Sequence, residues 1–234
     1  MRYVLPLLLV GFAASVSQAH FIWILPDDPP GTTVRVVFSD ALAPDENVPI
    51  NKIAQTKLFL RDSFGKVTTV DWQKGDRAYT VTLPKDGAVV LGGVCRYGVL
   101  KRGGSKPFLL EYFPKLVRGG LAALQSPTEL LLDIVPRDEG RFQVLFSGKP
   151  LAGAEVVVAG PDAKAKPTTL KTDVQGEFQL ASRKPGRYGI RVSQIENTQG
   201  THEGKKYEEV RRYATLVIDI ADAVEAKDSP AKPE

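Results

Sequence analysis

Residues 141–192 read RFQVLFSGKPLAGAEVVVAGPDAKAKPTTLKTDVQGEFQLASRKPGRYGIRV, and this stretch decides the fold. Short runs of β-branched and aromatic residues alternate in it with turn-forming segments, which are SGKP at 147–150, DVQG at 173–176 and KPG at 184–186. Runs of this length between such turns predict short antiparallel strands, as in a β-sandwich. The strands expected here and just beyond are residues 141–146, 154–158, 177–180, 187–192 and 213–220.

The same pattern continues toward the N-terminus with less regularity. Strands are expected there at residues 33–39, 57–61, 67–72, 78–83, 88–97, 108–113 and 130–135. Residues 115–124 suggest a helical turn, although Gly119 and Gly120 weaken it. The segment PRDEG at 136–140 interrupts the pattern.

The N-terminal residues form a predicted targeting signal. A short positive segment at 1–3 precedes an apolar run at 4–16, and SQA at 17–19 provides small residues for cleavage after Ala19. The apolar run is shorter than the roughly 20 residues of a membrane span. We therefore expect an exported protein of the periplasm or the extracellular space, with no membrane span in the mature chain. The alternative is an N-terminal anchor that is not cut.

These observations predict an all-β protein with two antiparallel β-sandwich domains after a cleaved signal peptide. The expected boundaries are 1–19 for the signal peptide, 20–136 and 137–220 for the two domains, and 221–234 for a disordered tail.

The composition excludes several kinds of site. A single cysteine excludes an intramolecular disulfide and a Cys-rich zinc site, and two histidines exclude a multi-histidine site. The formal net charge of +4 comes without a long basic run, which argues against nucleic acid as a partner. The chain has no G-x-S-x-G, H-E-x-x-H or phosphate-loop motif, so we predict no enzymatic activity.

Cleavage after Ala19 would make His20 the N-terminal residue. A free α-amine beside its own imidazole can chelate a metal ion through two nitrogens, and an amine pKa of about 7.7–8.0 allows deprotonation near neutral pH. Such ligands suit Cu(II) and Ni(II), with copper bound more tightly. We predict His20 as a metal ligand. The alternatives are an incidental residue and, among enzymes, a copper polysaccharide monooxygenase, to which the chain has no other resemblance.

Two further residues are candidate ligands. His202 lies in a polar segment, 197–206, and would reach His20 only if that segment folds back to the N-terminus. Its alternative role is that of a solvated loop histidine. Cys95 follows Gly-Gly-Val, and as a thiolate it would favour Cu(I) or zinc. Its alternative role is that of a small buried hydrophobic residue.

Residues 96–118 contain six basic residues, one acid and several aromatics. They could form a docking face for an anionic polymer or a protein, or a solvated loop. The alternative function, a structural or adhesive protein of the cell envelope, rests on this segment and on the sandwich pattern.

Three motifs resemble the transthyretin-like, carboxypeptidase-regulatory-like β-sandwich, namely GKPLAGAEV at 148–156, TDVQGEF at 172–178 and KPGRY at 184–188. Such sandwiches are common accessory modules, so this resemblance implies a fold and not a function.

The whole chain resembles the DUF4198 family, through the signal ending in Ala, HFIWILP at 20–26, the sandwich motifs and HEGKKY at 202–207. Members of that family are often described as periplasmic components of nickel or cobalt uptake. The resemblance implies a nickel, cobalt or copper ion as the bound species and a membrane metal transporter as the partner. The chain lacks a His-rich tract, which argues against high-capacity metal buffering.

Overall fold

The computed structural model describes residues 20–27, 32–119, 130–138 and 140–220. The predicted signal peptide and tail lie outside these residues. The strands are β1 (Phe21–Pro26), β2 (Thr33–Ser39), β3 (Lys57–Asp62), β4 (Val67–Val70), β5 (Gln73–Lys74), β6 (Tyr79–Thr82), β7 (Val89–Leu100), β8 (Phe108–Arg118), β9 (Leu132–Pro136), β10 (Arg141–Phe146), β11 (Lys149–Pro150), β12 (Glu155–Ala159), β13 (Thr168–Lys171), β14 (Glu177–Gln179), β15 (Gly186–Glu196), β16 (Gly200–His202), β17 (Lys205–Tyr207) and β18 (Glu209–Ile220).

The fold is all-β, as predicted. A short 3-10 helix, η1 (Ile50–Ile53), lies between β2 and β3. Within the described ranges, no helix is long and apolar enough to cross a membrane.

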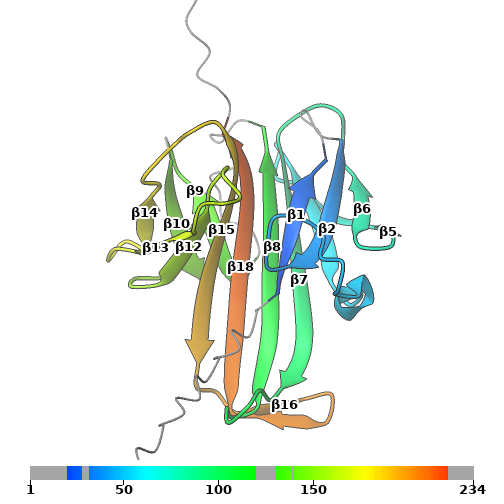
Figure 1. Cartoon of the computed structure of the whole chain (residues 1–234), viewed down its shortest axis with the longest axis vertical. Helices are drawn as coiled ribbons and strands as arrows, with labels where there is room; N and C mark the ends of the chain where they lie inside the picture. The colour runs from blue at the N-terminus through cyan, green and yellow to red at the C-terminus, as the bar shows by residue number, and fades with distance from the viewer. Residues whose placement is uncertain (1–19, 28–31, 120–129, 139, 221–234) are drawn as a thin grey trace, which may run out of the picture.

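One eight-stranded sheet runs through the whole molecule, in the order β13-β12-β15-β18-β8-β7-β3-β4. Its central pair, β18 and β8, is parallel, from Glu209 opposite Phe108 to Val217 opposite Leu116, while the other pairs are antiparallel. Strands from both predicted domains therefore join at the centre of a single sheet (Figure 1). The structure contains two sandwiches, and both use this sheet as one of their layers.

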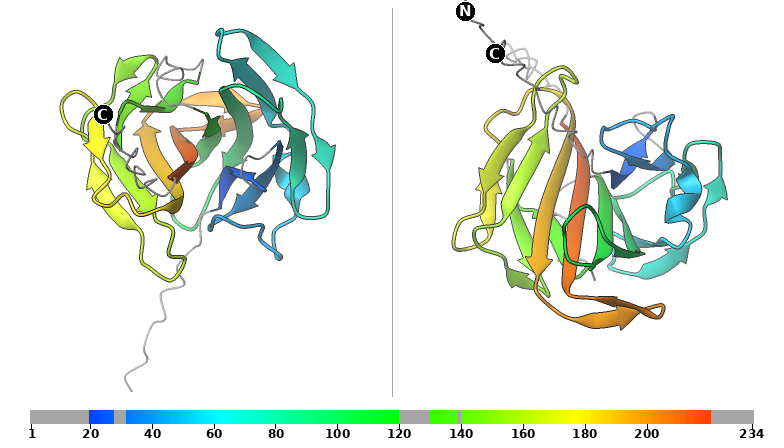
Figure 2. Two further views of the ribbon diagram at one scale, coloured as in Figure 1. Left: turned by 90° about the horizontal axis from the view of Figure 1, so that it is seen from above. Right: turned by 60° about the horizontal axis from the view of Figure 1, so that its bottom comes forward.

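Two smaller sheets complete the two sandwiches (Figure 2). The first has the order β1-β2-β6-β5, and its strand β1 packs against β8 and β18. The second combines β9, β10, β11 and β14, and its strand β9 packs against β18. Figure 1 shows these sheets toward opposite ends of the eight-stranded sheet.

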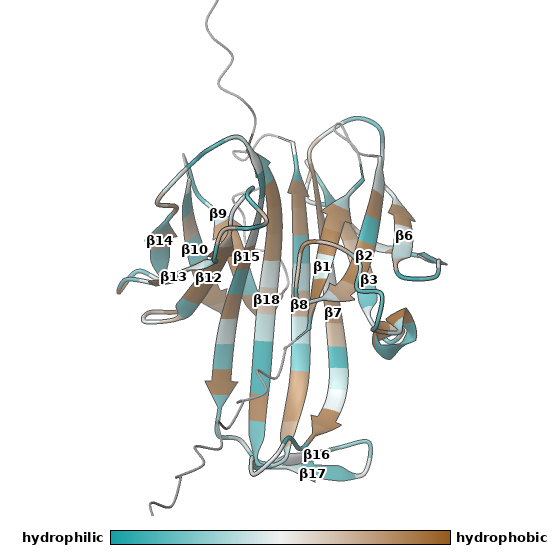
Figure 3. Ribbon diagram, viewed as in Figure 1, coloured by the Kyte–Doolittle hydropathy of each residue, from teal (hydrophilic) through white to brown (hydrophobic). Residues whose placement is uncertain are grey.

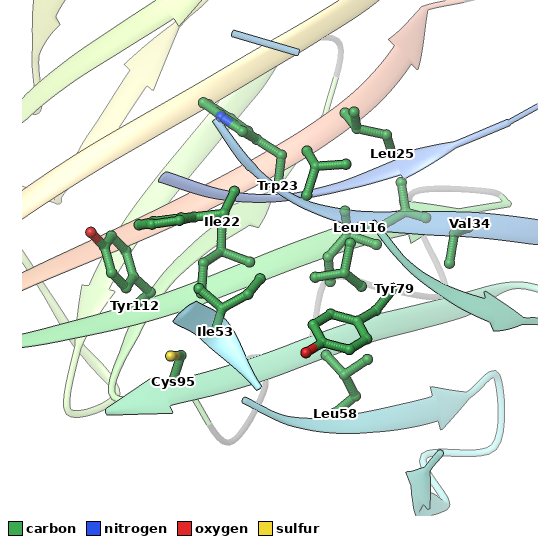
Figure 4. Packing of buried hydrophobic residues seen from close by; sticks show 14 of the residues in the cluster. Ile22, Trp23, Leu25, Val34, Ile53, Leu58, Tyr79, Cys95, Tyr112 and Leu116 are labelled. Carbon is green, nitrogen blue, oxygen red and sulfur yellow. The ribbon is translucent and has the colours of Figure 1, made fainter. Parts of the chain in front are cut away.

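Each sandwich has its own hydrophobic core, and neighbouring residues of β8 serve different cores. Tyr112 belongs to the first core, with Ile22, and Phe113 belongs to the second core, with Phe142. This follows because successive side chains on a strand point to opposite faces of the sheet. Figure 4 shows the first core, and Figure 3 shows the apolar character of β1, all six of whose residues are buried.

The predicted domain boundary at residues 136/137 differs from the packing. Strand β9 pairs with β10 along its whole length, and its residues Leu132 and Ile134 belong to the second core. Residues 130–136 therefore group with the C-terminal sandwich. The break in sequence pattern at 136–140 is only the turn between β9 and β10.

Two expected strands match the structure residue for residue, namely 33–39 and 141–146. The helical turn expected from residue 115 is wrong over 115–118, where β8 continues as a strand. Leu116 and Val117 are both buried there, one in each core, and this packing favours extended backbone. The sequence pattern also missed β1 and the hairpin of β16 and β17.

Candidate metal centre

His20 directly precedes β1, and two long-range hydrogen bonds fix this end of the strand. The Tyr112 hydroxyl donates to the backbone carbonyl of His20 at 3.0 Å, and the Thr215 hydroxyl donates to the carbonyl of Ile22 at 2.6 Å. Strand β1 also pairs with β2, with Phe21 opposite Ser39. The backbone at His20 is therefore held by β2, β8 and β18 together.

The imidazole of His20 is held by a carboxylate and an aromatic ring. Its Nε2 lies 2.8 Å from Oδ2 of Asp45, and its ring centroid lies 5.6 Å from that of Phe38. The other oxygen of Asp45, Oδ1, accepts the backbone N–H of Asn47 at 2.7 Å. This backbone bond, followed by the bond from His20, lowers the pKa of Asp45 below its usual range.

The Asp45 contact selects one tautomer of the imidazole. An ionised carboxylate can only accept hydrogen bonds, so Nε2 of His20 carries the proton, and in the neutral imidazole Nδ1 is the nitrogen with the lone pair. No hydrogen bond to Nδ1 comes from any residue that the structure describes. Nδ1 is also the ring nitrogen that can close a six-membered chelate ring with the α-amine of the same residue. Nδ1 of His20 would therefore be the ring donor of a chelate if cleavage made His20 the N-terminus.

A metal site made of side chains alone is not formed in the described part of the chain. It contains no group of three or more His, Cys, Asp or Glu side chains that could hold a metal ion. The residues present therefore fit a two-nitrogen chelate at His20, with Asp45 behind the ring, and they leave further coordination positions to water or to a partner.

The structure does not bring His202 to His20. His202 ends β16 in the hairpin with β17, at the lower end of the long strands in Figure 1. The chain after this hairpin meets the residue before β8, where the backbone N–H of Glu208 donates to Pro107 at 2.9 Å. His20 instead lies beside Tyr112, which is about 16 Å beyond Pro107 along the chain at about 3.3 Å per residue. The role of His202 as second ligand stays a prediction.

Cys95 is fully buried on β7, opposite Tyr112 in the first core (Figure 4). Burial raises the pKa of its thiol to about 11, against a smaller lowering effect of the hydrogen bond with Thr56. The thiol is therefore protonated at neutral pH. This geometry favours a packing role for Cys95 over that of a thiolate ligand.

The basic segment 96–118 finds partners inside the protein. Arg96 bonds to Glu111 at 2.8 Å, Lys115 forms a buried ion pair with Asp133, and Arg118 bonds to the carbonyl of Pro84. The segment is therefore not a loop but two paired strands, β7 and β8, joined by a turn. Its exposed cations are Arg96 on β7 and, in that turn, Lys101, Arg102 and Lys106.

Asp45 and Tyr112 were not predicted as parts of the site. Asp45 lies in the segment DALAPDENVP at 40–49, where an isolated acid carries no signal. Tyr112 reads as one more apolar position of an expected strand. Only the packing of β1 onto β8 makes Tyr112 a neighbour of His20, and only the path of the chain after β2 brings Asp45 to its imidazole.

Comparison with known proteins gives a match to a family model and several distant structures, three of which are described below. The model of the family described as "Domain of unknown function (DUF4198)" matches residues 116–196. No curated protein matches the chain. The description of the family names neither nickel nor cobalt, and the match does not confirm the carboxypeptidase-regulatory-like resemblance.

The distant structures have low sequence identity and low TM-scores. A tetra-tandem repeat from the extending region of a large adhesion protein is 14% identical, with a TM-score of 0.24, over 90% of this chain and 53% of that one. The BSP domain of a biofilm-associated protein is 12% identical, with a TM-score of 0.20, over 88% and 30%. The D0-D1 domain of intimin is 14% identical, with a TM-score of 0.21, over 80% and 89%. The chain spans about half the length of the first of these.

TM-scores of this size do not establish a shared fold, so these three structures carry no argument about this chain. The family match does carry an argument, and it runs from Leu116 in β8 to Glu196 at the end of β15. The DUF4198 model thus matches residues 116–196 of the chain, and this match supports the family that the sequence resembles.

Proposed function

We propose that this chain is an exported, non-enzymatic protein that binds a transition metal ion through the α-amine and Nδ1 of His20. The observation that carries the proposal is the contact of 2.8 Å between Nε2 of His20 and Oδ2 of Asp45. A metal-ligating histidine almost always donates its other ring N–H to a carboxylate or carbonyl, which fixes the ring and raises its basicity. Asp45 supplies this partner before any metal binds.

The donor set suggests which metals bind. Two nitrogen donors suit Cu(II) and Ni(II), and the usual order of affinities places copper above nickel and nickel above cobalt. The imidazole is also accessible, because 20% of the His20 side chain is exposed. A chelate with two protein donors leaves positions open for transfer, so we propose capture of the metal and delivery to a membrane transporter.

The alternative function, a structural or adhesive envelope protein, loses part of its basis. It rested partly on the basic segment 96–118 as a docking face, and Arg96, Lys115 and Arg118 of that segment have partners within the chain. The metal proposal, by contrast, gains the Asp45 contact, which the sequence alone did not suggest.

The test compares two N-termini on one protein. Mature protein that begins at His20 and a form with one extra glycine ahead of it are titrated with Cu(II), Ni(II) and Co(II) by calorimetry, and Cu(II) coordination is followed by EPR. We expect the extension to weaken Cu(II) binding at least about a hundredfold, because it converts the amine into an amide. The variant H202A, which keeps the N-terminus, should bind as the wild type does. Equal binding by the two N-termini would refute the proposal.

A further inference from the structure

A cavity of about 190 Å³ lies beside β1, and nothing in the proposed metal site uses it. Its floor comes from one face of the eight-stranded sheet, because Val157 is opposite Arg191, and Ser193 is opposite Tyr213. Phe21 closes one side, with its ring centroid 5.1 Å from that of Tyr213. The lining residues are Phe21, Glu155, Val157, Arg191, Ser193 and Tyr213.

Arg191 is the residue of this cavity that needs an explanation. Its Cζ lies 4.0 Å from the centroid of the Phe21 ring, and the side chain is partly buried. Burial lowers the pKa of its guanidinium, against the opposing charge effects of Tyr213 and Glu155. Among the described residues, no acceptor hydrogen-bonds to this guanidinium and no carboxylate forms an ion pair with it. Its guanidinium donors reach the cavity without an acceptor from the described residues, so they are available to a ligand.

Two other arginines of the same protein show what is missing at Arg191. Arg211 lies over the Phe108 ring at 3.9 Å, and Arg212 lies over the Phe146 ring at 5.3 Å. Each of them also pairs with a carboxylate of the chain, Arg211 with Glu209, and Arg212 with Glu111 and Glu196. Arg191 has the same stacking on an aromatic ring without the carboxylate. The missing partner is therefore an anion.

We propose that this cavity binds a small organic monocarboxylate, whose carboxylate group takes the place of the missing acidic residue at Arg191. A guanidinium matches a carboxylate with two parallel N–H···O bonds. The rings of Phe21 and Tyr213, with Val157, offer apolar contact to the body of the molecule. Glu155 lines the same cavity, and its charge disfavours anions with more than one negative charge, such as phosphate.

The size of the cavity limits the ligand. Pockets for drug-sized molecules measure about 300–1,000 Å³, so this one takes a smaller molecule. The site adjoins the proposed chelate through Phe21, which follows His20 in the chain, but it does not depend on the metal. Failure of either proposal leaves the other standing.

The test uses benzoate as the probe on the protein that begins at His20, without added metal. Binding is measured by calorimetry at millimolar concentrations, together with the benzoate-induced shift of the thermal unfolding temperature. We expect R191Q to weaken benzoate binding about tenfold or more, and R191K to lose most of it as well, because lysine lacks the planar fork. The matched control is R211Q, which removes an arginine that stacks on a ring but already has a carboxylate partner.

Two further arms make the outcome decisive. Inorganic phosphate should bind the wild type more weakly than benzoate, and E155Q should improve phosphate binding by removing the opposing charge. The unfolding temperature of each variant without ligand shows whether it folds. Absence of benzoate binding to the wild type, or equal binding to the wild type and a folded R191Q, would overturn the proposal, as would an equal loss of benzoate binding in R211Q.

Discussion

Oδ2 of Asp45 lies 2.8 Å from Nε2 of His20, across 25 residues of chain. Both side chains are mostly buried, with 20% of His20 and 18% of Asp45 exposed. The backbone N–H of Asn47 holds the other oxygen of Asp45, so the carboxylate cannot turn away without losing a second hydrogen bond. The ring orientation that the proposed chelate needs is thus present in the fold.

Removal of this carboxylate should weaken metal binding without abolishing it. We expect D45A to lower the Cu(II) affinity of the protein that begins at His20 about 10- to 100-fold, the usual cost of losing such a supporting partner. Calorimetric titration measures the effect. E46Q is the control, because Glu46 pairs with Arg77 and not with His20. Unchanged affinity in D45A would show that Asp45 does not support the chelate.

Ionisation of the Cys95 thiol should lower the free energy of unfolding at alkaline pH. Burial raises the pKa of its thiol from 9.0 to about 11, so the folded state favours the protonated form. This stabilisation is complete below pH 9 and is lost as the pH rises through 11, where the folded protein must also ionise the thiol. Two pKa units correspond to about 2–3 kcal/mol.

The measurement is urea unfolding of the wild type and C95A at a series of pH values. Between pH 9 and pH 11, the free energy of unfolding of the wild type should fall about 2 kcal/mol more than that of C95A. The subtraction removes the contribution of the tyrosines that titrate in the same range. Parallel pH profiles for the two proteins would contradict the assigned burial of the thiol.

Replacing only one residue of the buried ion pair of Lys115 and Asp133 should strongly lower the free energy of unfolding. Both residues are almost completely buried, at 3% and 1% exposure, and they join β8 to β9 across the second sandwich. Burial lowers the pKa of Lys115, against the raising effect of Asp133. K115M leaves the Asp133 charge without this ammonium and should cost about 3–5 kcal/mol of unfolding free energy.

The double variant K115M/D133L provides the comparison. Replacing both charges by apolar groups should recover most of the loss, because no uncompensated buried charge remains. Denaturant unfolding of the wild type, K115M, D133L and the double variant gives the coupling energy. Strictly additive effects of the two substitutions would mean that the two side chains do not interact.

Gly92 should be intolerant of a side chain for reasons of packing alone. The Phe59 ring lies over this glycine, and a Cβ added there would collide with the ring. We expect G92A to destabilise the protein by about 1–3 kcal/mol, as in other overpacked cores. G104A is the matched control, since nothing lies within 4 Å of a Cβ added at that position. In an F59A background the cost of G92A should largely disappear, and a cost that persists there would assign the effect to the backbone.

The sequence predicts individual strands well and their ends less well. Residues 33–39 and 141–146 match because alternation and turn residues are local properties of the chain. The eleven-residue strand β8 exceeds its prediction, because its second half lies between two cores that the local pattern does not reveal. The hairpin of β16 and β17 was missed because its residues are polar, and its turn is formed by Glu203 and Gly204, both with positive φ.

Some residues of the candidate site could likewise be predicted from the sequence, and others could not. His20 was found because its position after the predicted cleavage site is a property of the sequence. Asp45, Tyr112 and Arg191 were not found, because their importance comes from neighbours 25, 92 and 170 residues away in the chain. No local spacing connects such residues.

By itself, the sequence determined that this protein is built of short strands and predicted that His20 becomes its N-terminus. Only the tertiary structure decided that the two sandwiches share one sheet through the parallel pairing of β8 with β18, and that Asp45 meets the imidazole of His20. The physical reason is that side-chain alternation and turn chemistry act over a few residues, whereas the choice of strand partner depends on which apolar faces bury each other. The choice of strand partner therefore depends on the packing of the whole chain.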